Sequence, residues 1–250
     1  MFKITMIGMA FPRPYFEGKT FGFFQNFVLP RGETTQFEFV VRNGEIAVTY
    51  DLPEVYAEAV HWCWRYANVA LEPWASAASL VIGGGVDIFI DYFIDPSGRR
   101  HPLWVVDERL SKNIDAFSQT DEGWVELATF LSDCSDARRV ADDALMGIRR
   151  PDYMPIAGGR IVDRIKHIVT PDAPRGDAGW APMRDSLFVS RQFLEVLSAA
   201  SVDPRHGNPK ATDDGTYLDL SVRVWQLVNR YLHFERLGRH PLDRGVFQEL

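Results

Sequence analysis

The dominant period of the hydrophobic pattern differs between the two parts of the 250-residue chain, and this difference limits the folds that the chain can adopt. Before about residue 100, apolar and polar residues mostly alternate, which is typical of strands whose two faces differ. After about residue 110, apolar residues recur every three or four positions, which is typical of amphipathic helices. We therefore predict an α+β chain with two domains. Residues 1–109 form a mainly antiparallel sheet with one helix, and residues 110–250 form an all-helical bundle.

The strongest local signal of the first domain is the segment FEFVVRNGEIAVTY at residues 37–50. Two alternating runs flank Asn43 and Gly44, the pair that most readily adopts the positive φ angles of a tight hairpin turn. The segments FKITMIGM and FGFFQNFVL before it, and SLVIGGGVDIFIDYFIDPSG after it, predict further strands. Between them, LPEVYAEAVHWCWRYANVAL has the helical period, with Pro53 at a favourable position for a helix start.

Five helical patterns separated by polar loops follow in the second domain, and together they indicate a bundle. They cover residues 121–134, 136–148, 155–169, 182–201 and 216–236. The predicted buried faces are Ala137, Val140, Ala141, Ala144 and Leu145 on the second of these helices and Ile161, Ile165 and Ile168 on the third. We expect Pro204 to end the fourth helix, because proline lacks the amide that a helix interior needs.

Composition excludes several classes of protein. The hydrophobic fraction of 46% supports packed cores, and the net charge of −7 argues against a generally basic nucleic-acid binder but leaves a local cationic stripe open. The sequence has no DNA-binding signature. No apolar stretch is long enough to cross a bilayer, and the amino terminus has no signal-peptide pattern. The two cysteines, Cys63 and Cys134, are far apart and indicate reduced thiols. These features predict a cytoplasmic protein with no membrane partner.

The motifs that usually mark an active site are missing. Gly83, Gly84 and Gly85 follow an apolar run, but no phosphate-binding lysine motif and no dinucleotide fingerprint accompany them. No histidine, cysteine or acidic residues recur at zinc-ligand spacing, and no nucleophile motif is present. The sequence therefore predicts neither a metal site nor a cofactor.

Arginine and histidine residues on the C-terminal helices are the candidate binding residues. They lie at helical spacing opposite dense apolar faces. The set comprises Arg160, Arg164, His167, Arg184, Arg223, Arg230 and His233. Such stripes are most often solvated helix faces held by pairs such as Asp219 and Arg223, although guanidinium groups also suit phosphate. Both interpretations stay open at this point.

Arg205 and His206 form the one candidate catalytic pair. They lie in DPRHGNP, residues 203–209, where we expect one helix to end and the chain to turn away. A structural role is sufficient, because cations near a helix C-terminus are favoured by its dipole. A functional role is also chemically sound. A neutral histidine can accept the proton of a ribose 2′-hydroxyl, and an arginine can stabilise the charge on a phosphorane.

A helical bundle of this length with an Arg/His element at a helix junction, after a β-rich domain, resembles the HEPN superfamily. The resemblance covers about residues 120–240 and implies a dimer, a place in bacterial defence or toxin control, and metal-independent cleavage of RNA in active members. The family motif separates its arginine from its histidine by four to six residues, whereas Arg205 and His206 are adjacent. Arg160 and His167 have the family gap, but Ile161 stands where a polar residue is usual.

Three functions follow as hypotheses. The first is a non-catalytic binding or regulatory protein that self-associates through its helical domain and engages protein or RNA. The second is a metal-independent ribonuclease that uses Arg205 and His206, with Arg230 and His233 as helpers. The third is a small-molecule-binding protein with a pocket between the two domains. It is suggested by tryptophans at positions 62, 64, 74, 104, 124 and 180.

Overall fold

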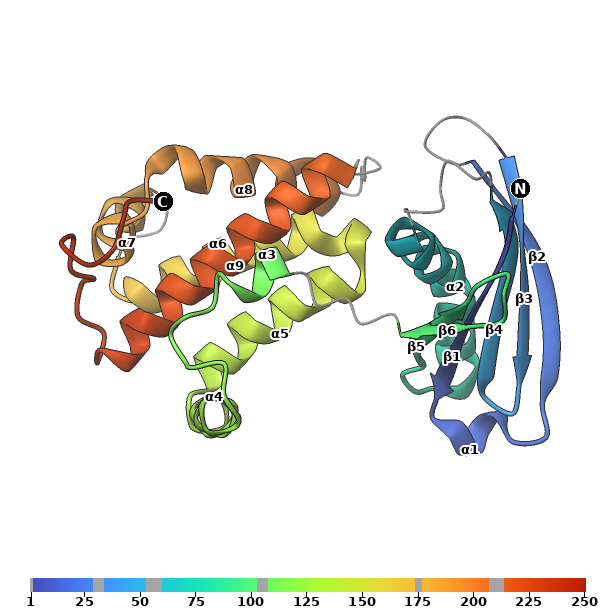
Figure 1. The fold of residues 1–250 in the computed structure, drawn as a ribbon. Coiled ribbons are helices and arrows are strands. Elements are labelled where there is room, and N and C mark those ends of the chain that lie inside the picture. The colour runs from blue at the N-terminus through green and yellow to red at the C-terminus, as the bar shows by residue number, and fades with distance from the viewer. Residues whose placement is uncertain (1, 29–33, 53–59, 103–107, 174–176, 207–213) are drawn as a thin grey trace. The chain divides into compact units, whose positions relative to one another are not determined.

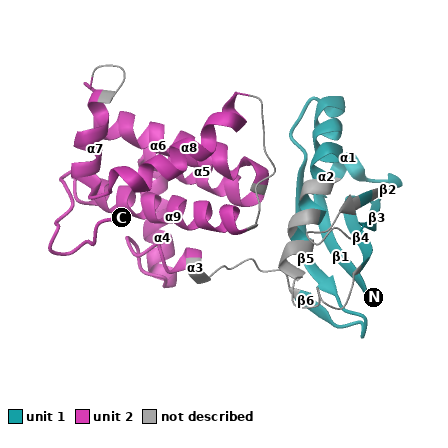
Figure 2. Cartoon of the chain, turned by 90° about the horizontal axis from the view of Figure 1, so that it is seen from above, with its two compact units in different colours: residues 1–105 teal, residues 106–250 magenta. Residues whose placement is uncertain are grey.

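The computed structural model describes residues 2–28, 34–52, 60–102, 108–173, 177–206 and 214–250. The chain divides into two compact units, Met1–Val105 and Val106–Leu250 (Figure 2). The first unit is built on an antiparallel sheet and the second consists of helices (Figure 1), so the predicted α+β fold class is confirmed. The boundary predicted from the sequence lies between residues 109 and 110. No helix in the described ranges is long and apolar enough to cross a membrane.

The sheet of the first unit has the strand order β2-β3-β4-β1-β5-β6, and every neighbouring pair is antiparallel. The strands are β1 (Phe2–Phe11), β2 (Thr20–Val28), β3 (Thr34–Arg42), β4 (Glu45–Leu52), β5 (Asp87–Ile94) and β6 (Arg100–Pro102). The predicted hairpin is confirmed, since Asn43 and Gly44 join β3 to β4 with φ angles of 52° and 82°. This turn fixes the register, which places Phe39 opposite Val48.

One face of the sheet is covered by helix α2 (Val60–Ile82), as Figure 1 shows. Phe37, Phe39 and Tyr50 point to that side and are almost completely buried with Leu71 of α2. The Phe37 and Tyr50 rings stack with their centroids 4.3 Å apart. The single turn α1 (Arg13–Phe16) completes this unit. The alternation of β3 and β4 therefore encodes the sheet face that α2 covers.

Helix α2 differs from its prediction at its C-terminal end. The predicted start at Pro53 lies outside the described residues. The helix continues to Ile82, so Ser79–Ile82, predicted as part of a strand, is helical. The Ser79 hydroxyl donates to the Ala75 carbonyl at 2.7 Å, and the helix ends at Gly83, whose φ of +67° suits glycine. The strand begins at Asp87, after the glycine run.

The second unit is a set of helices packed around α6. Its helices are α3 (Glu108–Ser111), α4 (Asp121–Asp133), α5 (Ser135–Arg149), α6 (Met154–Val169), α7 (Trp180–Leu187), α8 (Arg191–Arg205) and α9 (Asp214–Arg236). Helix α6 contacts α5, α8 and α9, which explains why so many of its side chains are buried. Its predicted inward residues Ile161 and Ile165 are fully buried, and Ile168 packs at the edge of the same core.

Three expectations about the helices are wrong. The predicted helix 182–201 is two helices, because Phe188 adopts a left-handed conformation and Ser190 caps α8 by accepting from the Phe193 amide. Pro204 does not end α8, which continues to Arg205, because a proline in the last turn removes only one late hydrogen bond. Leu145 of α5 is 45% exposed, since it lies beside the narrow buried stripe rather than on it.

Candidate binding site

The best candidate site of the helical unit is a pocket between α7 and α8, with a volume of about 380 Å³. Its lining combines cationic, aromatic, acidic and hydroxyl side chains with small apolar ones. The lining residues are Trp180, Ala181, Arg184, Arg191, Leu194, Glu195 and Ser198. The sharp turn at Phe188 and the cap at Ser190 bring the two helices together, so the break in the predicted helix is what creates the pocket. We call it the α7–α8 pocket.

Trp180 is held at the start of α7 by contacts with the end of α6. The ammonium group of Lys166 lies 4.2 Å from the centroid of the indole ring, a cation–π contact. Gly179 precedes the tryptophan, and a Cβ there would come within 2.6 Å of the Thr170 hydroxyl oxygen. Only glycine therefore lets this segment approach α6 so closely, and this approach sets the position of the indole.

Arg184 is a cation of this pocket that has no partner among the described residues. Within the described parts of the chain, no hydrogen bond or ion pair engages its guanidinium group. Arg191, at the start of α8, donates to Glu195 at 2.6 Å, but both side chains are more than half exposed, at 78% and 58%. An exposed pair of this kind contributes little stability. The pocket therefore presents cationic groups beside an aromatic ring, an arrangement suited to an anion that carries a flat ring.

Two other predicted binding residues, Arg160 and Arg164, are engaged by one buried carboxylate. Asp143 of α5 is 8% exposed. It accepts from Arg164 at 3.0 and 3.1 Å and pairs with Arg160 at 3.2 Å, and Arg160 also donates to the Tyr153 hydroxyl. We call this group the α5–α6 ion cluster. Its arginines join two helices, which leaves little of their charge for a ligand.

The candidate catalytic pair lies at the end of α8. The Arg205 guanidinium donates to Asp163 of α6 at 2.8 Å. His206 is exposed and serves as the C-cap of α8, its amide donating to the carbonyls of Val202 and Asp203. His167, the remaining candidate on α6, is exposed on the same helix as Asp163. The structure thus gives Arg205 a partner within the fold.

The candidates on α9 also have intramolecular partners. Arg223 pairs with Asp219 at 2.8 Å, as the spacing of the two residues predicts. Arg230 is almost buried, and its guanidinium donates to the Gln248 carbonyl and lies 4.6 Å from the Phe247 ring centroid. Burial lowers the pKa of Arg230. These contacts attach the C-terminal segment to α9.

His233, one turn beyond Arg230, belongs to the same end of the helix. Its ring nitrogen Nε2 lies 2.7 Å from a carboxylate oxygen of Asp115, which also accepts from the Asn229 amide. Burial raises the pKa of Asp115, but hydrogen bonds from His233 and Asn229 outweigh it, and the pKa falls below its usual value. The group therefore ties the segment before α4 to α9.

The structure does not bring the four residues of the ribonuclease hypothesis together. Figure 1 shows that α9 begins near the end of α8 and then runs back across the bundle. Arg230 and His233 lie in its last two turns, and Arg230 is about 24 Å along the helix from its start. Arg205 and His206 stay at the opposite end. Within one chain, the two pairs cannot act on the same bond.

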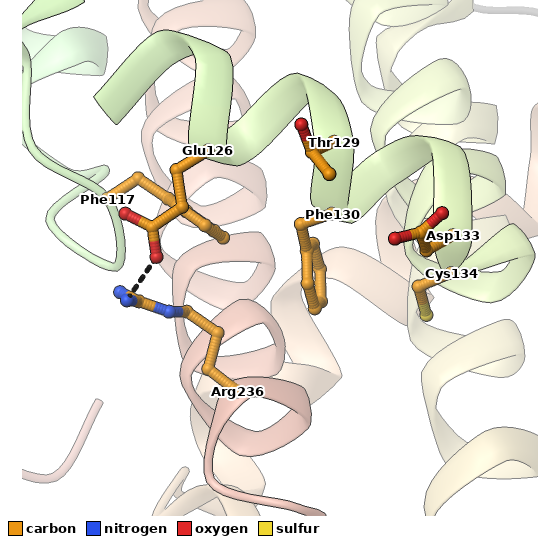
Figure 3. Close-up of a pocket in the computed structure, with 7 residues that line it drawn as sticks. All are labelled: Phe117, Glu126, Thr129, Phe130, Asp133, Cys134 and Arg236. Atoms are coloured by element: carbon orange, nitrogen blue, oxygen red, sulfur yellow. Dashed lines mark hydrogen bonds and ion pairs between the residues drawn. The ribbon is translucent and has the colours of Figure 1, made fainter. Parts of the chain in front are cut away.

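A second pocket of about 440 Å³ lies between α4 and the end of α9 (Figure 3). It is lined by Phe117, Glu126, Thr129, Phe130, Asp133, Cys134 and Arg236. Its single cation, Arg236, donates to Glu126 at 2.6 Å, and Asp133 adds a further carboxylate. We call it the α4–α9 pocket. With two carboxylates and one cation, its charge is less favourable for an anion than that of the α7–α8 pocket.

Sequence reasoning named Arg184 as a binding candidate and Trp180 among the tryptophans that suggest a small-molecule pocket, but it did not bring the two together. Trp180 lies in the segment TPDAPRGDAGWAP, predicted as a loop, and Lys166 lies on a predicted helix without any special spacing. A tryptophan directly after a glycine, beside a helix start, is the one signal that was available. Asp143 was missed because Asp142 beside it is equally polar, and only the packing of α5 decides which of the two is buried. No group of residues in the described ranges is arranged to hold a metal ion.

Comparison with known proteins gives one similarity. Residues 126–236 match a family model described as the C-terminal domain of a domain of unknown function, DUF8168. No curated protein and no solved structure is significantly similar to the chain. The matched segment begins within α4, ends with α9, and includes every residue that lines the α7–α8 pocket. The similarity therefore covers the candidate site but assigns it no activity.

Proposed function

We propose that this chain is a non-catalytic binding protein whose helical unit engages single-stranded RNA. The proposal takes the first of the three hypotheses and selects RNA from its two classes of partner. Self-association, a role in bacterial defence or toxin control, and kinship with the HEPN superfamily stay predictions. So does a small-molecule pocket between the two units.

The pairing of the arginines supports the non-catalytic part. Arg160, Arg164 and Arg205 each engage a carboxylate on a neighbouring helix. An arginine held in this way joins helices and has less charge to offer a phosphorane. His206, which caps α8, has no second cation of the proposed set beside it, because Arg230 lies near the far end of α9. Catalysis by an Arg/His set needs these groups on one reacting centre.

The α7–α8 pocket supports the RNA part, and the unpaired Arg184 beside Trp180 is the observation that carries it. Proteins bind single-stranded nucleic acid by combining cations for the backbone with aromatic rings for the bases. The overall charge of −7 restricts this mode to a local site and excludes a broad basic surface. A short, single-stranded segment fits such a site better than a long duplex.

Fluorescence anisotropy with a labelled ten-nucleotide RNA tests the proposal. We expect saturable binding that weakens as salt is raised, and weaker binding of duplex DNA of the same length. The same mixtures, kept in EDTA and run on a denaturing gel, should contain intact RNA with the wild-type chain and with His206→Ala alike. Absence of RNA binding would refute the proposal. Cleavage that His206→Ala abolishes would favour the ribonuclease hypothesis instead.

A further inference from the structure

The α7–α8 pocket has the size of a site for one small ligand rather than for a length of nucleic acid. Its volume of about 380 Å³ lies in the range of about 300–1,000 Å³ that small-molecule pockets occupy. Its lining offers separate places for an anion, a flat ring and hydroxyl groups. We infer that this pocket binds a single nucleotide, either free or as one unit of a single-stranded RNA. The inference rests on the proposed function and names its ligand.

The phosphate is assigned to Arg184. Its guanidinium group has no partner among the described residues, and its planar fork matches two phosphate oxygens at once. Arg191 from the neighbouring helix lines the same pocket and adds a second positive charge to it. Two arginines from two helices thus face one small volume, which favours a dianionic phosphate over a singly charged carboxylate.

The base is assigned to Trp180. The indole lines the pocket, and Lys166 over the ring holds its orientation before any ligand arrives. A ring fixed in this way loses little conformational entropy on binding. Stacking on an aromatic ring accepts every base, so this contact predicts affinity without strong base preference.

The ribose is assigned to Glu195 and Ser198, which lie on the α8 side of the pocket. A carboxylate accepts several hydrogen bonds, so Glu195 can accept from ribose hydroxyls while it pairs with Arg191. The Ser198 hydroxyl can donate or accept. A contact to the 2′-hydroxyl distinguishes RNA from DNA, so the pocket should prefer the ribonucleotide to its deoxy form.

The α4–α9 pocket provides the internal control. It has a similar volume, two aromatic rings and one arginine, but Glu126 neutralises Arg236 and Asp133 adds negative charge. A phosphate there meets two carboxylates for one cation. Substitution of Arg236 should therefore leave nucleotide binding unchanged, whereas substitution of Arg184 should not.

Isothermal titration calorimetry with adenosine monophosphate, and anisotropy with the ten-nucleotide RNA, test the inference on the full chain. We expect Arg184→Ala to weaken the binding of adenosine monophosphate, of the RNA, or of both by roughly tenfold or more, as expected for loss of a charge-assisted hydrogen bond. Arg236→Ala should change neither affinity, and deoxyadenosine monophosphate should bind more weakly than the ribonucleotide. Circular dichroism would confirm folding, and Arg184→Gln replaces Arg184→Ala if the alanine variant is unfolded.

The two binding assays distinguish a free nucleotide from RNA as the ligand, and they distinguish failure of this inference from failure of the proposed function. Loss of affinity for the free nucleotide identifies a nucleotide-binding protein, and loss confined to RNA identifies a subsite for one unit of a strand. If RNA binds but Arg184→Ala and Arg184→Gln leave both affinities unchanged, the inference is wrong while the proposed function stands. If neither ligand binds the wild-type chain, both are wrong.

Discussion

The α5–α6 ion cluster and the α7–α8 pocket both contain arginines, but these differ in how they are paired. In the cluster, Arg160 and Arg164 converge on a carboxylate that is 8% exposed. In the pocket, Arg184 has no partner among the described residues, and Arg191 pairs with the exposed Glu195. The first arrangement holds helices together, and the second leaves charge for a ligand.

The difference shows what decides the role of an arginine on an amphipathic helix. In the sequence, both sets lie on polar stripes opposite apolar faces, and nothing in their spacing separates them. The separation comes from the neighbouring helix. Helix α5 places Asp143 against α6, whereas Trp180 lies one turn before Arg184 on α7 and the turn at Phe188 brings Arg191 of α8 near them. An unpaired guanidinium group in a pocket is therefore better evidence of function than a row of arginines at helical spacing.

Substitution of Asp143, in the α5–α6 ion cluster, should lower the stability of the fold more than the other changes considered. Asp143→Ala leaves two arginines on α6 without their shared carboxylate, and we expect it to lower the free energy of unfolding by about 3 kcal/mol. This value is at the lower end for a broken buried ion pair, because Arg160 is partly exposed. Urea unfolding followed by circular dichroism measures this. Asp142→Ala, on an exposed position of the same helix, is the matched control and should change little. Equal effects of the two would show that the cluster contributes no stability.

A change at Gly159 should sharpen the comparison at the contact between α6 and α8. A Cβ at this position would overlap Ser201 and the Arg205 guanidinium, so Gly159→Ala forces α8 away from α6. We expect a loss of about 2 kcal/mol, the usual result of overpacking. At Gly158 an added Cβ meets Leu197 at 3.3 Å and Val224 at 3.4 Å, and the better helix propensity of alanine offsets that contact. Thermal unfolding should therefore rank Gly159→Ala well below Gly158→Ala, and the reverse order would contradict the packing described for this seam.

The contribution of Asp115 to the stability of the fold should depend on pH, and it is the smallest of the expected effects. Because its pKa is lower in the folded chain than its usual value, its ionised form stabilises the fold above about pH 4, and this contribution is lost as the pH falls through the folded pKa. Asp115→Asn should therefore be less stable than the wild type at pH 6, and the two should converge below about pH 4. Urea midpoints measured across this range test the prediction. Curves that stay parallel down to pH 3 would show that the contact with His233 does not depend on the charge of Asp115.

Much of the fold follows from local patterns in the sequence, since the residues that determine it are close together in the chain. Asn43 and Gly44 fix a hairpin by their own backbone preferences, and Ile161 and Ile165 mark a buried face by their spacing. The break at Phe188 was missed because a left-handed phenylalanine has no local signal, and tertiary contacts must hold it.

The site was less predictable than the fold. Arg184 was among seven binding candidates, and only the structure distinguishes it, because the pairing of candidates such as Arg164 depends on helices that meet in space. The end of α8 near Pro204 was also not predictable from the sequence alone. The position of this proline within α8 is tolerated because it lies in the last turn, and this places Arg205 against Asp163 rather than in a loop.

The tryptophan indole N–H signals provide the most direct test of where a ligand binds. In a ¹H–¹⁵N correlation spectrum, each of the seven tryptophans contributes one indole signal, and Trp180→Phe identifies the one from the α7–α8 pocket. During titration with adenosine monophosphate, we predict that the Trp180 signal shifts saturably, with the affinity measured by calorimetry, while that of Trp124 on α4 does not move. A Trp180 signal that stays fixed while the ligand binds would contradict the assignment of the α7–α8 pocket as the site.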